Sequence, residues 1–261
     1  MILTLGFVGL VSSAYANCGL EHCPMPDSSV KKASIGVSVA LAETSEDSIF
    51  SGEMGLQGRI RIAKDWLVGG RVPVHAAVFD ESTILGSGNG LLYVHWQTGT
   101  PKKGLALGTQ IELPIASRSE MGESHWMALP YAQTWLALTV GTVPVETLLE
   151  TGWAKSLERS DGHDHSHASS PQLNPHTGNE VQSRAEVRAV LPRTTGALTS
   201  VWVGAQLGSI VEVDTAQLLL STGAVVGFKT ARHSVQSSLM LPVGEYRRHN
   251  YRWQIQVQQY F

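Results

Sequence analysis

The chain ends in the stretch Tyr251-Arg-Trp-Gln-Ile-Gln-Val-Gln-Gln-Tyr-Phe261. Large apolar residues stand at every second position from Tyr251 to Val257, and the residues between them are polar. A period of two predicts a β-strand with one apolar face and one polar face. Two structures suit such a strand. In a soluble sandwich its apolar face packs on a second sheet, whereas in a membrane barrel that face meets lipid and the polar face lines the lumen.

The same alternation recurs through most of the chain after about residue 33. It predicts about twelve strands of roughly ten residues, the length that a tilted strand needs to cross a bilayer. The expected strands are 34–42, 54–62, 66–78, 91–98, 105–115, 126–140, 143–157, 181–191, 198–207, 216–228, 233–241 and 251–261.

The segments between these strands read as connections that alternate between longer and shorter along the chain. Residues 80–89 and 208–214 are expected to be loops, and 158–180 is the longest stretch without periodicity. With both chain ends in the periplasm, the long connections fall on the outer side. The sequence therefore predicts an all-β fold: a transmembrane, antiparallel, up-and-down β-barrel over 33–261.

Charged residues lie on the polar faces of many of these strands. Two arginines on one strand face, such as Arg59 and Arg61, are costly in a packed soluble core but suit a hydrated lumen. Two interpretations stay open: the charges pair and seal the interior, or they line a hydrated path whose field selects solutes. The predicted lumen-lining residues are Arg59, Arg61, Arg71, His75, His95, Glu112, Glu146, Glu150, Arg184, Glu186, Arg188 and Arg252.

The N-terminal region reads as an export signal followed by a short periplasmic segment. Residues 2–11 are nearly all apolar and Ala14-Tyr15-Ala16 follows them, which predicts a signal peptide over 1–16. Residues 17–32 then hold the only two cysteines, Cys18 and Cys23. In an exported chain, a close pair predicts a local disulfide, and the alternative is a metal site that also uses His22.

The long connection 158–180 is rich in histidine. His163, His165, His167 and His176 accompany acidic residues there, and imidazole nitrogen binds zinc or copper. A cluster without supporting contacts would bind such a metal weakly and unselectively. The alternative is a solvated loop without a metal role, and no other cofactor is expected.

Several functions find no support in the sequence. The net charge of −3 gives no argument for nucleic acid. The chain contains neither a phosphate-binding loop nor a dinucleotide-binding glycine motif. It also lacks the G-x-S-x-G sequence of many serine hydrolases, although His125 and His233 are present. We therefore predict that the protein is not an enzyme.

Three stretches carry a resemblance to known proteins. The aromatic Phe261 that closes the last strand resembles the C-terminal signal by which assembly machinery recognises outer-membrane barrels. Gly104-Leu-Ala-Leu-Gly-Thr-Gln-Ile-Glu-Leu-Pro-Ile-Ala116 resembles an element of the outer-membrane β-barrel family named for meta-pathway phenol-degradation transporters. Leu239-Met-Leu-Pro-Val-Gly-Glu-Tyr-Arg-Arg-His249 is similar to part of that family's last hairpin. The resemblance implies a barrel and outer-membrane transport, and we carry no substrate across.

Together these features predict a passive outer-membrane channel or transporter for small solutes. The alternatives are a metal-binding surface protein that the barrel anchors, and a sealed structural barrel. The expected partners are outer-membrane lipid, the barrel-assembly machinery and a small solute.

Overall fold

The computed structural model of the chain describes residues 32–44, 50–79, 82–117, 126–157, 179–192, 198–244, 246 and 249–261. The predicted signal peptide lies outside these residues, as do Cys18, Cys23 and the four histidines His163, His165, His167 and His176. Among the described residues, no helix is long and apolar enough to cross a membrane.

Thirteen β-strands make up the described part of the chain. They are β1 (Ala33–Thr44), β2 (Phe50–Ala63), β3 (Trp66–Phe79), β4 (Ser82–Ser87), β5 (Gly90–Thr100), β6 (Lys103–Leu113), β7 (Met127–Val140), β8 (Val143–Ser156), β9 (Asn179–Pro192), β10 (Leu198–Glu212), β11 (Gln217–Thr230), β12 (His233–Val243) and β13 (His249–Tyr260).

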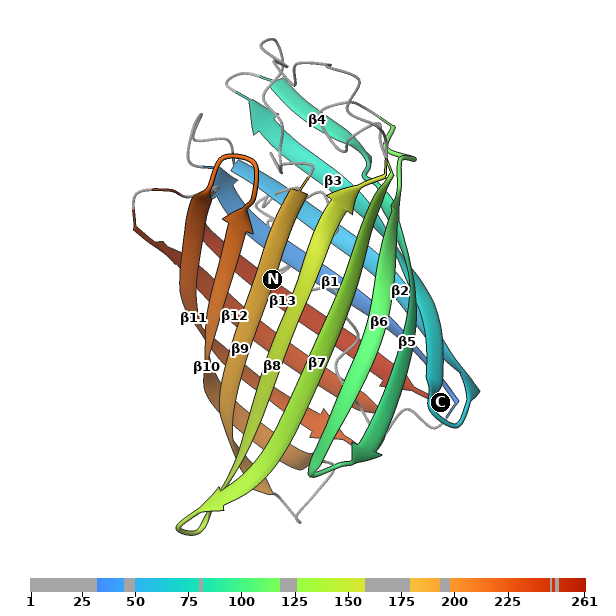
Figure 1. Cartoon of the computed structure of the whole chain (residues 1–261), viewed down its shortest axis with the longest axis vertical. Helices are drawn as coiled ribbons and strands as arrows, with labels where there is room; N and C mark the ends of the chain where they lie inside the picture. Colours follow the sequence, from blue (N-terminus) through green and yellow to red (C-terminus); the bar gives the residue numbers. More distant parts are fainter. Residues whose placement is uncertain are drawn as a thin grey trace, which may run out of the picture.

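The strands form one closed sheet (Figure 1). Neighbouring strands pair antiparallel, and β13 returns to pair with β1, where Val257 stands opposite Val37. Because β4 pairs only with the last part of β3, the other twelve strands close the wall. Closure leaves no free edge in this twelve-stranded wall, whereas β4 pairs with β3 alone. The predicted antiparallel, up-and-down barrel of about twelve strands is confirmed.

The strand β4 corrects the prediction of a loop over 80–89. Val74 pairs with Ser87 of β4, whereas Arg71 pairs with Leu91 of β5, so the register slips by one residue between them. The slip marks a β-bulge, which bends a strand without ending it. In Figure 1, β4 and the end of β3 rise as a ribbon above the neighbouring wall.

The predicted loop over 208–214 is also wrong in part. β10 continues to Glu212, and the connection to β11 is the turn Val213–Ala216. The predicted loop began at Gly208, but the alternation resumes after this residue, and Ile210 pairs with Leu219 of β11. Ala216 has a positive φ of 55° in this tight turn.

The two ends of the barrel differ in their connections. One end, which we call the turn end, carries the short turns Lys64-Asp65, Pro101-Lys102, Gly141-Thr142 and Ala231-Arg232. Phe261 also lies there, where its amide donates to the carbonyl of Ala33. At the opposite end, the loop end, β6 and β8 finish and β7 and β9 begin, separated in the sequence by residues 114–126 and 157–178. The expected alternation is therefore visible, except that the turn Val213–Ala216 at the loop end is short.

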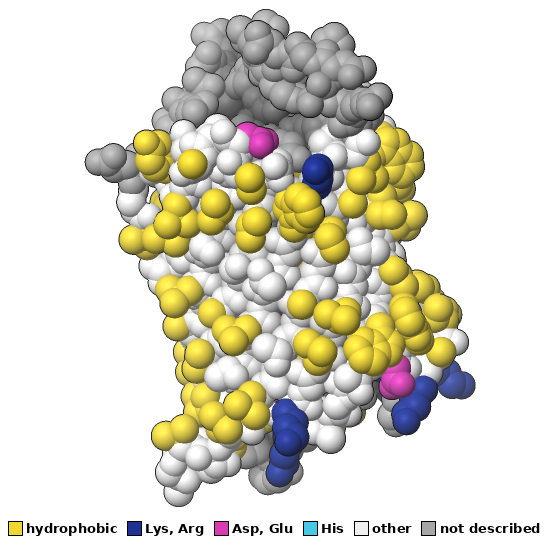
Figure 2. Space-filling view, in the orientation of Figure 1, with side chains coloured by type: hydrophobic (Ala, Val, Ile, Leu, Met, Phe, Trp, Pro, Cys, Tyr) yellow, Lys and Arg dark blue, Asp and Glu magenta, His cyan; other side chains and the backbone are white. Residues whose placement is uncertain are grey.

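The wall is apolar outside and polar inside. Leu56, Leu149 and Leu207 are more than half exposed, at 55%, 54% and 59%. Figure 2 shows hydrophobic side chains spread over the outer wall, with the visible charged ones toward the two ends. By contrast, Gln110 and Glu186 on inward faces are almost fully buried. A soluble protein has the opposite arrangement, so the outer face of this barrel is built to meet lipid.

Candidate functional site

The twelve predicted lumen-lining residues all fall within described strands, on the faces opposite the exposed apolar side chains. They do not form one group. Some gather on β8 and β9, others lie between β1 and β3, and others surround a cavity at the turn end. Each group is described below.

The first group is an ion-pair ladder along β8 and β9, made of Glu146, Glu150, Arg184, Glu186 and Arg188. Arg184 reaches Glu150 at 3.4 Å and Glu186 at 2.7 Å. The Nε atom of Arg188 lies 2.9 Å from Glu186 and 3.9 Å from Glu146. Arg184 and Arg188 stand opposite Glu150 and Glu146 across the two strands, and both flank Glu186 on β9, so each buried carboxylate of the ladder has a cationic partner.

Two glutamines extend this ladder, and the sequence prediction missed both of them. Gln133 of β7 donates to Glu150 at 2.5 Å, and Gln206 of β10 donates to Glu186 at 2.5 Å. Gln133 satisfies Oε1 of Glu150, whereas Arg184 contacts Oε2, and Gln206 shares Oε2 of Glu186 with Arg184. Their inward position in the strand alternation was the signal, but only arginine, glutamate and histidine residues were taken as candidates.

The second group lies between β1, β2 and β3. Arg71 forms an ion pair with Glu53 and donates from Nη2 to the Ser38 hydroxyl at 3.2 Å. His75 stands opposite Glu53 in the register and is fully buried. The sequence prediction also missed Glu53, although this residue lies on the same face of β2 as the predicted residues Arg59 and Arg61.

A third contact crosses the inner face from β5 to β7. His95 Nδ1 lies 3.0 Å from the Tyr131 hydroxyl, and Gly108 of β6 stands between them in the register. A Cβ atom on Gly108 would collide with the ring of Tyr131. The ring therefore covers a glycine on the neighbouring strand, an arrangement that fills the gap left by the missing side chain.

Replacing Gly108 with Ala is expected to destabilise the barrel by about 1–3 kcal/mol, because Tyr131 must move and lose its contact with His95. The matched control is Gly58→Ala. Gly58 faces outward and an added Cβ meets nothing within 4 Å, so a change within about 0.5 kcal/mol is expected. Urea unfolding of the refolded barrel, followed by tryptophan fluorescence, measures both. Equal effects of the two changes would contradict this packing.

Asn89 ties the bulge between β4 and β5 to the following hairpin. Its amide donates to Glu112 at 2.7 Å, and its carbonyl oxygen accepts from the Ala116 amide at 3.2 Å. Glu112, predicted as lumen-lining, is almost fully buried at this position. Asn89 therefore holds the start of the connection after β6 against the barrel.

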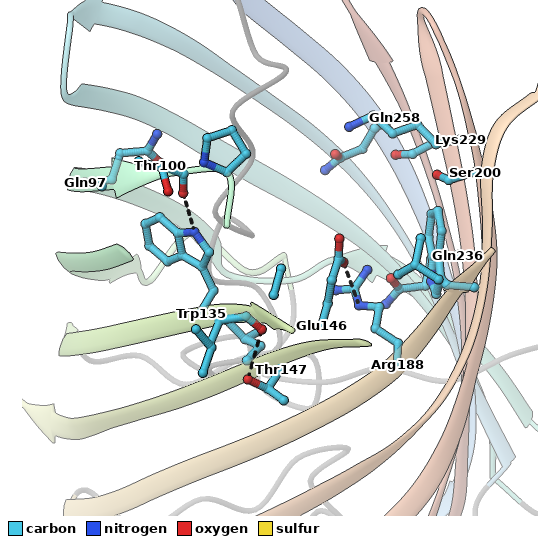
Figure 3. A pocket seen from close by; sticks show the side chains of 18 of the residues that line it. Gln97, Thr100, Trp135, Glu146, Thr147, Arg188, Ser200, Lys229, Gln236 and Gln258 are labelled. Atoms are coloured by element: carbon cyan, nitrogen blue, oxygen red, sulfur yellow. Dashed lines mark hydrogen bonds and ion pairs between the residues drawn. The ribbon is translucent and has the colours of Figure 1, made fainter. Parts of the chain in front are cut away.

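A cavity of about 570 Å³ occupies the lumen at the turn end, and we call it the chamber (Figure 3). Three aromatic side chains contribute to its wall: Trp135, Trp202 and Tyr260. Trp135 Nε1 donates to the carbonyl of Thr100 at 2.9 Å, so its ring is fixed at the chamber wall. The charged lining residues are Arg61, Lys64, Asp65, Glu146, Arg188 and Lys229.

Tyr260, the last residue of β13, connects the chamber to the first strands. The ring lies 5.2 Å from Lys229 Nζ and 6.0 Å from the guanidinium carbon of Arg59. Its hydroxyl lies 2.8 Å from Ser234 Oγ and donates to Gln258 at 3.1 Å. Arg59 also donates to Ser34 at 2.7 Å. The final strand thus supplies an inward aromatic in addition to its apolar outer face.

Charge is distributed unevenly along the barrel axis. The buried residues Glu53, Glu112 and Glu180 lie toward the loop end, in β2, β6 and β9. Arg59, Arg188 and Lys229 lie toward the turn end of their strands. Arg252, also buried, is an exception near the loop end of β13. The described lumen is therefore richer in carboxylates toward one end and in cations toward the other.

No protein-family profile and no curated protein matches the chain. Solved structures do match it. The COG4313 outer membrane channel from Pseudomonas putida F1 has a TM-score of 0.56 at 15% identity, over 88% of this chain and 96% of that one. KdgM porin has a TM-score of 0.54 at 10% identity, over 87% of this chain and 99% of that one. LpxR from Salmonella typhimurium has a TM-score of 0.51 at 10% identity, over 87% and 100%.

At these identities the likeness concerns the fold. The phenol-degradation name of the resembled family stays a prediction. The closed sheet satisfies its backbone groups internally, and its apolar outer wall requires lipid. The chain is therefore a twelve-stranded β-barrel of the bacterial outer membrane.

Proposed function

We propose that the protein is a passive outer-membrane channel for small polar solutes. The observation that carries this proposal is the polar interior of the closed barrel, which contains the chamber of about 570 Å³ at the turn end. Charged groups on an inner wall need water or partners, and a barrel that served only as an anchor could fill its interior with apolar side chains. The ladder residues brace the wall, while the chamber provides room for a solute.

The size of the chamber bounds the solute class. A volume of about 570 Å³ falls among the pockets that hold small molecules. Hydroxyl, amide and charged groups line it together with three aromatic rings, which suits a solute that carries polar groups. In this proposal the turn end faces the periplasm, because barrels of this class place their short turns there. The proposal assigns no chemical reaction to the protein.

Reconstitution tests the channel directly. We expect the refolded barrel to conduct ions across a planar lipid bilayer in discrete steps and to admit small sugars into liposomes. Trp135→Ala, which removes a ring from the chamber wall, should raise the single-channel conductance. Trp153→Ala is the matched control, because that ring is 45% exposed and lies among the exposed side chains of β8. Folded protein that passes neither ions nor sugars would refute the channel.

A further inference from the structure

We propose that the chamber contains a binding site for a small organic carboxylate, formed by Arg188, Trp202 and Lys229. The site belongs to the same chamber and rests on the proposed channel, for which it names the solute class. Three observations carry it: the placement of these residues on adjacent strands, an indole donor without an acceptor, and the balance of charge around the chamber.

The three side chains come from consecutive strands of the wall. Arg188 of β9 pairs with Gly204 of β10, and Trp202 lies two residues before that glycine. On the other side Trp202 pairs with Gly227 of β11, two residues before Lys229. Since residues two apart share a strand face, all three side chains point into the lumen at similar depth. All three line the chamber, and Figure 3 shows Arg188 and Lys229 within it.

The Trp202 ring is held in place from both sides. A Cβ atom on Gly227 would collide with the ring, so the indole lies directly over that glycine. The guanidinium carbon of Arg188 lies 5.4 Å from the ring, within cation–π range. Arg188 is in turn anchored to Glu186 at 2.9 Å. Because the ring is already held in place, binding a ligand would cost less side-chain conformational entropy.

Trp202 also presents a hydrogen-bond donor that lacks an acceptor. Its side chain is only 7% exposed, and Nε1 has no hydrogen-bond partner among the described residues. Buried polar groups are nearly always satisfied, so an orphan donor beside a polar cavity indicates a missing acceptor. A carboxylate oxygen is such an acceptor, and the adjacent cations favour a charged one.

The charge of the lining favours an anion over a cation. Arg61, Lys64, Arg188 and Lys229 contribute positive charge to the chamber, against Asp65 and Glu146. No group of three or more histidine, cysteine or carboxylate side chains capable of holding a metal ion occurs among the described residues. A small carboxylate would therefore find complementary charge here, together with hydroxyl donors such as Ser200 and Ser234.

Equilibrium binding tests this site with succinate as the probe. Isothermal titration calorimetry on the folded barrel in detergent at low salt is expected to show saturable binding of succinate, and none of its neutral diamide, succinamide. Arg188→Gln and Lys229→Gln should each weaken succinate binding at least tenfold, which is the scale of one charge-assisted hydrogen bond. Trp202→Phe keeps the ring, removes the donor and should weaken binding severalfold.

The matched control is Lys155→Gln, which removes one positive charge from an exposed side chain outside the chamber, 5.0 Å from the Trp153 ring. It should leave succinate affinity unchanged. Circular dichroism and the heat-modifiable mobility of folded barrels identify variants that fail to fold, and Lys229→Gln keeps the test decisive if Arg188→Gln does not fold. Absence of binding to wild-type protein, or equal affinity in Lys229→Gln, would overturn the site.

The succinate-binding experiment and the conductance experiment can succeed or fail independently of each other. Succinate binding without conductance would support the carboxylate site and refute the channel. Conductance without any succinate binding would refute the site and leave the channel standing.

Discussion

Replacing Arg71 with Met is expected to lower the free energy of unfolding by about 3–5 kcal/mol, the range measured when one partner of a buried ion pair is removed. The Arg71 and Glu53 side chains are only 3% and 0% exposed. The Glu53 carboxylate has no hydrogen-bond partner among the described residues, so Arg71 supplies its compensating charge. Without Arg71 the carboxylate must stay buried as an uncompensated charge or take up a proton.

A double-mutant cycle separates this effect from the loss of other Arg71 contacts. Glu53→Gln combined with Arg71→Met removes both charges, and its cost should be clearly smaller than the sum of the two single changes. Arg61→Met is the matched control, because Arg61 lies at the turn end, where Nη1 donates to the Lys64 carbonyl at 2.5 Å. That change should cost about 1 kcal/mol or less. Urea unfolding from detergent gives all four values, and additive single changes would exclude the pairing.

The strand pattern made most of the barrel predictable from the sequence. In β13, Tyr251 through Val257 alternate as the wall requires, because lipid and lumen select opposite side chains at successive positions. The same rule placed Arg184, Glu186 and Arg188 on one face of β9. Lipid on one face and the lumen on the other impose an alternation with a period of two. This alternation is a strong local signal, and recognising it needs no information about distant residues.

The two stretches wrongly predicted as loops, 80–89 and 208–214, contain glycines across which the backbone pairing continues. Gly208 reads as a loop residue, yet it lies inside β10, opposite Ser221 of β11. Gly86 similarly occupies β4, opposite His75. A glycine in a barrel strand accommodates a neighbour's side chain or a bulge, and the sequence of one strand does not contain that neighbour. Predicting whether such a glycine lies in a strand or in a loop therefore requires knowledge of the strand register.

Contacts across strands were beyond the reach of sequence analysis. The ion pair between Glu53 and Arg71, the contact between His95 and Tyr131, and the ring of Trp202 over Gly227 all join different strands. Each depends on the register, which fixes which inward side chains become neighbours. The chamber depends on it as well, because its lining comes from turns and strand ends spread from residue 61 to residue 260.

The second prediction with a large effect on stability concerns two adjacent leucines of β8. Leu148 and Leu149 are adjacent residues near the middle of β8, and they point to opposite sides of the wall. Leu149 is 54% exposed on the outer face, whereas Leu148 is 3% exposed and lines the chamber. Leu149→Arg is expected to cost about 2–4 kcal/mol, because a charge on the lipid face near the bilayer midplane must leave hydrocarbon or deform it.

Leu148→Arg introduces the same side chain one residue away and should cost about 1 kcal/mol or less. Its methylene stem can replace the apolar contacts of leucine, while its guanidinium reaches the chamber. Glu186 pairs with Leu148 in the register, and Glu146 lies two residues away on the same face, so the new cation finds carboxylates nearby. Unfolding from lipid vesicles measures both variants against wild type. If Leu148→Arg destabilises the barrel as much as Leu149→Arg does, residue 148 does not face water and charged groups. The interior of the barrel would then not be polar at the level of this residue, which would contradict the proposed channel.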